Sequence, residues 1–151
     1  MSQVGTRSDA GLATAMRISV SRLARRLRVE QRLTVGGPDP ALSDIQLAAL
    51  AALERNEAMT PGELAEYEKV QPPSMTRVIA VLEERSLVRR SPHPTDRRQV
   101  ILTVTDEGRS LVDRVRRRKE AWLAQRMQEL TAEEVAILRA AAPILEKLSQ
   151  S

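Results

Sequence analysis

The chain has 151 residues, of which 42% are hydrophobic, and this length and apolar content are enough for one domain with its own core. Its net charge of +4 is only modestly basic. The absence of cysteine excludes disulfides, thiolate metal sites and cysteine nucleophiles, and a content of one Trp, one Tyr and no Phe disfavours the base stacking on which binders of single-stranded nucleic acid depend. No apolar signal segment begins the chain and no run approaches the roughly 18 residues of a transmembrane helix, so we expect a cytoplasmic protein without a membrane partner.

The first predicted element is an amphipathic helix over residues 12–27. Its apolar positions recur at spacings of three and four residues and include Leu12, Met16 and Leu23, while arginines occupy the other face. The stretch "TVGGPDP" follows, and its glycines and prolines break any helix. We interpret this stretch as a connection inside one domain.

Three later helices have clear starting points. Each begins with a hydroxyl residue that is followed three positions later by Gln or Glu, a capping box in which each residue satisfies a free backbone amide of the other. The pairs are Ser43 with Gln46, Thr60 with Glu63, and Thr131 with Glu134.

Residues 60–88 predict two short helices separated by a sharp corner. The first covers about 61–68 and ends at the prolines of "VQPP", which also begin the second helix. The second helix has one buried face, and its outer face is small, polar and basic. The buried set is Met75, Val78, Ile79 and Leu82, and the outward set includes Ser74, Thr76 and Arg77. This pattern matches a helix-turn-helix with a DNA-recognition helix, although helical pairs in enzymes share it.

A β-hairpin is predicted next. Strand-like residues at 87–88 and 100–104 flank "SPHPTDRR", whose prolines and polar residues are typical of a stiff turn. The segment from Arg85 to Arg98 carries five arginines and one acidic residue, a surplus of four that equals the net charge of the whole chain. We interpret the hairpin as a wing that presents arginines to a DNA backbone or minor groove, with Asp96 placed to pair with Arg98. The alternative is a solvated hairpin with an incidental charge run.

Two further helices are predicted after Thr105. They present more apolar surface than a small winged-helix core requires, which favours coiled packing against a partner over packing within the chain. The first helix carries Leu111, Val112 and Val115, and the second carries Val135, Leu138, Ile144 and Leu145. Asp113 and Arg117 are spaced for an ion pair on the charged face of the first helix.

The text "PSMTRVIAVLEERSLVRRSPHPTDRRQVILTVTDEG" resembles the MarR family of bacterial winged-helix transcription regulators. The wing fits the family's pattern of Asp-x-Arg, five residues, an apolar residue and Thr, at Asp96, Arg98, Val104 and Thr105. One departure is Ser86, which stands where the family commonly has glycine, so we expect its left-handed cap to be strained or differently shaped.

The resemblance extends over the whole chain and implies a fold. We expect one mainly α domain with a small β-wing, in which residues 42–105 form a winged helix and residues 10–33 and 106–150 form dimerisation helices. The implied dimerisation residues are Leu12, Met16, Leu23, Val135, Leu138, Ile144 and Leu145.

The resemblance also implies a function. We expect a homodimeric, sequence-specific regulator that binds a palindromic operator in double-stranded DNA, and a repressor that a small aromatic effector releases. The implied DNA-binding residues are Thr60, Ser74, Thr76, Arg77, Arg89, Arg90, Asp96, Arg97 and Arg98.

No motif for catalysis or metal binding is found. The single histidine, His93, lies between two prolines in the predicted wing, and the chain has no glycine-rich phosphate loop, no nucleophile elbow and no His or Cys pair with metal-ligand spacing. We therefore expect neither an enzyme nor a cofactor. The alternative function is a winged-helix module that binds protein partners or acts as a scaffold without a specific DNA target.

Overall fold

The computed structural model describes residues 4–34 and 42–150, so the connection predicted from "TVGGPDP" lies almost entirely outside the described residues. The described elements, in chain order, are α1 (Val4–Thr34), α2 (Asp44–Asn56), α3 (Pro61–Tyr67), α4 (Pro72–Glu84), β1 (Val88–Pro92), β2 (Val100–Val104), α5 (Asp106–Met127) and α6 (Ala132–Ser149). The fold is mainly α with one antiparallel hairpin, as predicted. The first helix is longer than the predicted range of 12–27.

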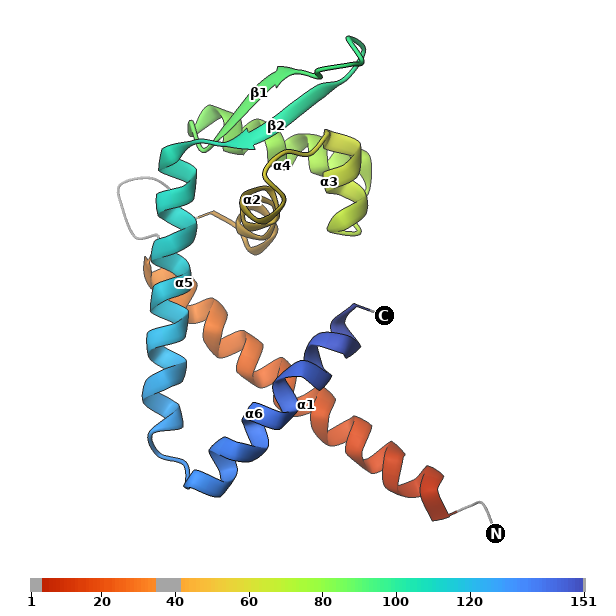
Figure 1. Ribbon diagram of the computed structural model, residues 1–151, viewed down its shortest axis with the longest axis vertical. Helices are drawn as coiled ribbons and strands as arrows, with labels where there is room; N and C mark the ends of the chain where they lie inside the picture. Colours follow the sequence, from red (N-terminus) through yellow and green to blue (C-terminus); the bar gives the residue numbers. More distant parts are fainter. Residues whose placement is uncertain (1–3, 35–41, 151) are drawn as a thin grey trace.

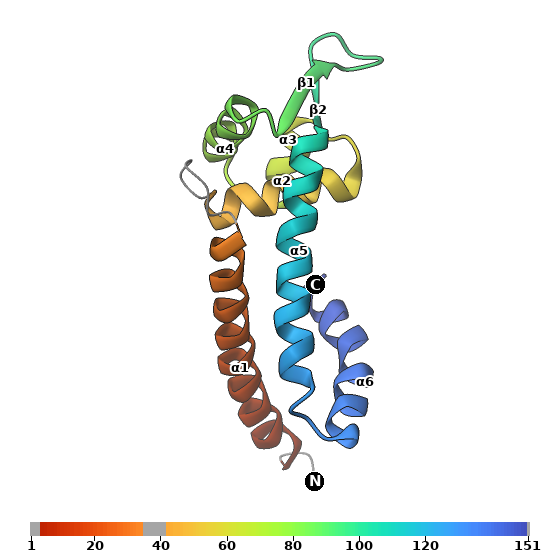
Figure 2. The same cartoon turned by 90° about the vertical axis from the view of Figure 1, so that its left-hand side faces the viewer.

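The molecule has two parts, which Figure 1 shows at opposite ends. The head consists of residues 42–105, with α2, α3, α4 and the hairpin. The stem consists of α1, α6 and the C-terminal half of α5. Helix α5 runs from the head into the stem and packs against both α2 and α1. In Figure 2, α1 and α6 lie on opposite sides of α5.

The hydrophobic core lies in the head. Its largest fully buried side chains come from α2, α3, α4 and β2, and they are Leu50, Leu53, Leu64, Met75, Ile79, Leu82 and Leu102. The buried face predicted for the second helix of the pair is confirmed, because all four of its residues are buried in α4. Leu111, Val112 and Val115 are also buried in this core. Their assignment to a partner surface was wrong, because the first half of α5 packs on α2 of its own chain.

All three predicted capping boxes are present and fix the starts of α2, α3 and α6. At α3, for example, the Glu63 amide donates to Thr60 Oγ1 over 3.2 Å, and the Thr60 amide donates to Glu63 Oε2 over 3.0 Å. The first turn of the helix-turn-helix is therefore held by side chains rather than by solvent.

The wing comprises residues 88–104. Its strands pair from Val88 opposite Val104 to Pro92 opposite Val100. On its other edge, β2 exchanges two backbone hydrogen bonds with Met59, which donates to the Leu102 carbonyl over 3.2 Å and accepts from the Leu102 amide over 2.8 Å. Because Leu102 is also fully buried, the base of the wing is fixed to the head.

Hydrogen bonds link the chain just after α4 to the start of α5. The residue after α4 that takes part is Ser86, which has a φ of 59°. This left-handed geometry is the cap that the sequence predicted. Thr105 Oγ1 donates to the Ser86 carbonyl over 2.6 Å and accepts from the Gly108 amide over 3.1 Å. The Thr105 amide donates to the Leu87 carbonyl over 3.0 Å. Gly108 is needed there because a Cβ would collide with the Leu87 carbonyl oxygen.

Candidate nucleic-acid interface

The outer face of α4 is exposed as predicted. Ser74, Thr76 and Arg77 are all exposed, in the N-terminal half of a helix that begins with two prolines. The Thr76 hydroxyl donates to the Pro72 carbonyl over 3.0 Å. With its proton used inside the helix, Thr76 can offer an acceptor and a methyl group to an outside molecule, but not a donor.

Thr60 lies at the N-terminus of α3 and is partly buried. Its Oγ1 accepts from the Glu63 amide, so the hydroxyl proton remains available to donate. A phosphate oxygen is an acceptor that this position would suit.

The tip of the wing carries Arg97 and Arg98, which are both exposed. Asp96 is half-buried, and its Oδ1 accepts from the backbone amide of Arg98 over 3.0 Å. Among the described residues, the predicted Asp96–Arg98 pairing is thus made at the backbone and not at the guanidinium. Asp96 therefore shapes the turn and leaves the charged end of Arg98 exposed.

The two arginines of β1 differ in their surroundings. Arg89 and Arg90 are both exposed. The guanidinium of Arg90 lies 2.7 Å from Oε1 of Glu83 in α4. Successive side chains of a strand point to opposite faces, so only one of the two can reach α4. Sequence reasoning treated these arginines as equivalent.

The stem carries an exposed apolar surface. No residue of α6 is buried, and its large apolar side chains are exposed by up to 60%, at Ile137 and Ile144. On α1, Leu12 is 59% exposed. Of the predicted dimerisation residues, Leu12, Leu23, Leu138, Ile144 and Leu145 are exposed, and Met16 and Val135 are half-buried. Ile18 of α1 and Ile137 of α6 are also exposed apolar residues and were missed.

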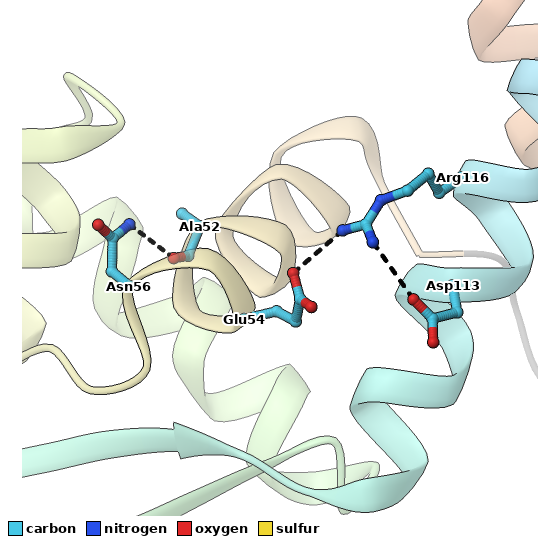
Figure 3. A network of polar contacts seen from close by, with 5 residues as sticks. All are labelled: Ala52, Glu54, Asn56, Asp113 and Arg116. Carbon is cyan, nitrogen blue, oxygen red and sulfur yellow. Dashed lines mark hydrogen bonds and ion pairs between the residues drawn. The ribbon is translucent and has the colours of Figure 1, made fainter.

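Arg116 joins the head to α5. Figure 3 shows its guanidinium between Glu54 of α2 and Asp113 of α5, at 3.0 Å and 3.3 Å. The sequence suggested that Asp113 pairs with Arg117 at i, i+4. The pairing with Arg116 at i, i+3 replaces it, because Arg116 can contact Glu54 at the same time.

A pocket of about 330 Å³ lies where α1, α2 and α5 meet, and sequence reasoning assigned none of its residues to a ligand site. Its lining consists of Arg28, Gln31, Asp44, Leu47, Ala48, Ala51, Arg55, Val112, Val115, Arg116 and Lys119. The lining includes five apolar residues, and its charged residues are four basic ones and one acid. These residues come from three separate helices, so no local motif marks them.

The charged side of this pocket is partly paired. Asp44 accepts a hydrogen bond from Nε2 of the buried Gln31 over 3.2 Å and lies 3.6 Å from Nε of Arg28. Burial lowers the pKa of Lys119, the Asp44 carboxylate opposes this shift, and Arg28 adds to it. A bound anion would therefore reduce the unfavourable energy of the charged Lys119.

Within residues 4–34 and 42–150, no three His, Asp or Glu side chains are grouped so that they could hold a metal ion. None of the helices in that part of the chain combines the length and apolar character needed to cross a membrane.

Comparison with known proteins gives a consistent result. Residues 42–100 match the family model described as MarR family. The chain is 46% identical over 145 residues to the HTH-type transcriptional regulator ML2140 of Mycobacterium leprae, covering 95% of this chain and 97% of that protein. It is 30% identical over 142 residues to the HTH-type transcriptional repressor MdtR of Bacillus subtilis, covering 93% of this chain and 87% of that protein. A crystal structure of a transcriptional regulator from Pseudomonas aeruginosa PA01 matches with a TM-score of 0.78 and 32% identity, and the match covers 95% of this chain and 97% of that chain.

Proposed function

The chain belongs to the MarR family of DNA-binding transcriptional regulators, which are not enzymes, and from this premise we propose that it is a homodimeric repressor of a palindromic operator, released by a small organic anion. The observation that carries the proposal is the position of the exposed polar face of α4 beside an exposed, arginine-bearing wing. A protein-binding module or scaffold would not need a reading helix and a basic hairpin side by side.

Helix α4 enters the major groove in this proposal. Arg77 is the base-reading residue, because a guanidinium can donate to both O6 and N7 of guanine. Thr76 can accept from an exocyclic amine or place its methyl group against thymine, since its own proton is bonded to the Pro72 carbonyl. Ser74, the third residue of α4, contacts either a base or a phosphate.

The wing and the start of α3 position the duplex. Arg97 and Arg98 at the tip contact the minor groove or its phosphates, and Arg89 and Thr60 contact the backbone. Arg90 and Asp96 act less directly. Arg90 is paired with Glu83, and Asp96 holds the turn of the tip.

The exposed apolar surface of the stem is the proposed dimer interface. Water-exposed leucines and isoleucines along α1 and α6 are best covered by the same surfaces of a second copy. A two-fold dimer would present its two α4 helices to half-sites about 34–36 Å apart, one turn of duplex. This division assigns residues 10–33 and the part of 106–150 that lies beyond the head core to dimerisation, and 42–105 to DNA binding.

The pocket between α1, α2 and α5 is the proposed effector site. Its apolar residues suit an aromatic ring and its basic residues suit a carboxylate or phenolate. Because it lies between the stem and the head, a ligand there would contact both parts and could favour one relative orientation of the two.

Selection of genomic fragments by the purified protein, followed by titration of a selected duplex and a scrambled one, tests the DNA function. We expect a specific-to-nonspecific affinity ratio of about 10³ or more that persists as salt is raised. Equal affinity for both duplexes at every salt concentration would favour the scaffold alternative.

Leu145→Glu tests the dimer, with Arg139→Glu on the same helix as control. Because no residue of α6 is buried, neither change should unfold the head. We expect Leu145→Glu to sediment as a monomer and to lose the preference for a full palindrome over one half-site. A dimeric Leu145→Glu protein with an intact preference would contradict the proposed interface.

A further inference from the structure

The ring of His93 lies inside the wing tip, residues 93–99. Its Nδ1 lies 3.2 Å from the Thr95 amide nitrogen, 3.1 Å from the Asp96 amide nitrogen and 3.3 Å from Thr95 Oγ1. Two of these three groups are backbone N–H donors. Nδ1 must therefore accept, which requires the neutral ring with its proton on Nε2.

The remaining backbone bonds close the tip around this ring. The His93 amide donates to the Gln99 carbonyl over 3.2 Å, and the Gln99 amide donates to the Asp96 carbonyl over 3.1 Å. The prolines on either side of His93 fix two φ angles next to the ring. The path of the chain through Arg97 and Arg98 thus depends on what His93 accepts.

His93 also lines a cavity that the wing shares with the head. A small pocket of about 190 Å³ lies between the wing and the start of α3, lined by Ala58, Met59, Thr60, Glu63, His93 and Ile101. The charged residues of this pocket and of the tip are Glu63 from α3 and, within the tip, Asp96, Arg97 and Arg98. The Glu63 carboxylate already accepts from the Thr60 amide, and that of Asp96 accepts from the Arg98 amide.

We propose that His93 is a positioning residue for DNA binding, whose neutral ring folds the wing tip so that Arg97 and Arg98 face the duplex, and whose protonation opens the tip. A protonated imidazole is a donor at both nitrogens, so Nδ1 would confront two N–H groups that it now accepts from. Protonation of the ring therefore weakens operator binding. This inference rests on the proposed contact of the wing with DNA.

Two substitutions separate the hydrogen bonds from the charge. In His93→Asn, Oδ1 can accept at about the place of Nδ1 and does not titrate. In His93→Gln, the amide reaches the place of Nε2 and leaves the Nδ1 position without an acceptor. Protonation also adds a positive charge near DNA, which favours binding, so wild type alone would not distinguish the two effects.

The first test uses the full-length free protein and does not depend on DNA. We expect long-range ¹H–¹⁵N spectra at pH 8 to show His93 protonated at Nε2 only, and the Thr95 and Asp96 amides to be protected from exchange. Protection should fall on acidification in wild type, persist in His93→Asn, and be lost at both pH values in His93→Gln. A proton on Nδ1 at pH 8, or equal amide exchange in wild type and His93→Gln, would overturn the proposal.

The second test measures affinity for a selected operator duplex at pH 8 and pH 5.5. Wild type should weaken by about tenfold more than His93→Asn on acidification, which corresponds to the net loss of roughly one or two hydrogen bonds. His93→Gln should be weak at both pH values. Equal affinities of the Asn and Gln variants would contradict the inference.

Arg98→Ala identifies which proposal has failed. If its operator affinity equals that of wild type, the wing does not contact DNA, and the proposed function of the wing fails together with the effect of His93 on binding. The exchange data then still report whether His93 folds the tip. If Arg98→Ala weakens binding while the Asn and Gln variants bind alike, the wing contacts DNA and only the role of His93 is refuted.

Discussion

The guanidinium of Arg90 donates two hydrogen bonds to Oε1 of Glu83, from Nη2 at 2.7 Å and from Nε at 3.0 Å, and so connects the first strand of the wing to the last turn of α4. Both side chains are partly exposed, and pairs of this kind stabilise a fold by only about 0.2–1 kcal/mol. Their main effect is on position and charge. Glu83 neutralises one arginine of the wing and holds the strand against the helix.

We therefore expect Arg89 and Arg90 to contribute unequally to DNA binding. Arg89→Ala should reduce the slope of log affinity against log salt by roughly one unit, and Arg90→Ala should reduce it less. Glu83→Gln should strengthen binding to operator and scrambled duplexes by the same factor, because it removes a negative charge beside Arg90. Titrations at several salt concentrations measure these slopes. Identical slopes for the two alanine variants would show that Glu83 does not divert Arg90.

Arg77→Ala should reduce specificity more than affinity. A bidentate arginine discriminates between bases by about 1–3 kcal/mol, so the variant should bind operators changed at one position nearly as well as the parent operator. Arg89→Ala is the matched control, since a phosphate contact is lost equally on all sequences. Binding to a panel of single-position variants gives the comparison. A uniform loss on the whole panel would make Arg77 a phosphate contact.

Ser86→Gly should stabilise the protein. A left-handed residue with a Cβ is unfavourable by about 1–2 kcal/mol, and the greater freedom of glycine in the unfolded chain offsets part of this. We expect the free energy of unfolding to rise by up to about 1 kcal/mol in urea titrations at fixed protein concentration. Ser86→Ala keeps the strain and should show no gain. A destabilised glycine variant would mean that the Ser86 side chain makes a favourable contact.

Glu68→Gln should change the pH dependence of stability. Burial raises the pKa of Glu68 above its ordinary value of 4.5, and Arg55 opposes the shift. The folded state therefore holds this proton more tightly than the unfolded state, and the wild type loses stability as pH rises from about 4.5 through the raised pKa. Relative to wild type, Glu68→Gln should gain stability over that window and keep the gain at higher pH. Urea unfolding at several pH values tests this, with the exposed Glu66→Gln as control.

The elements with a local signal could be predicted. Proline and capping residues mark the start of α3 at Thr60 and of α4 at Pro72, and the spacing of Met75 and Leu82 gives the buried face of α4. The ends of α1 were underestimated, because the apolar residues recur regularly at spacings of three and four only over residues 12–27.

Contacts between distant residues could not be predicted. Arg116 pairs with Glu54, 62 residues away, and Arg118 pairs with Glu30, 88 residues away. Spacing alone allows Asp113 to pair at i+3 or i+4, and only the position of Glu54 on α2 selects Arg116. The pocket has the same origin, because three helices contribute its walls and none of them carries a recognisable motif.

The Thr105 hydroxyl links the carbonyl of Ser86 to the amide of Gly108, and so connects the chain just after α4 to the first turn of α5. Gly108 packs so closely on Leu87 that no hinge can open between them without breaking these bonds. We therefore expect helix α4 and the first half of α5 to move as one body. In the proposed dimer, a change in the angle between the two α5 helices would change the separation of the two α4 helices. The spacing of operator half-sites that the dimer fits is then set far from any base.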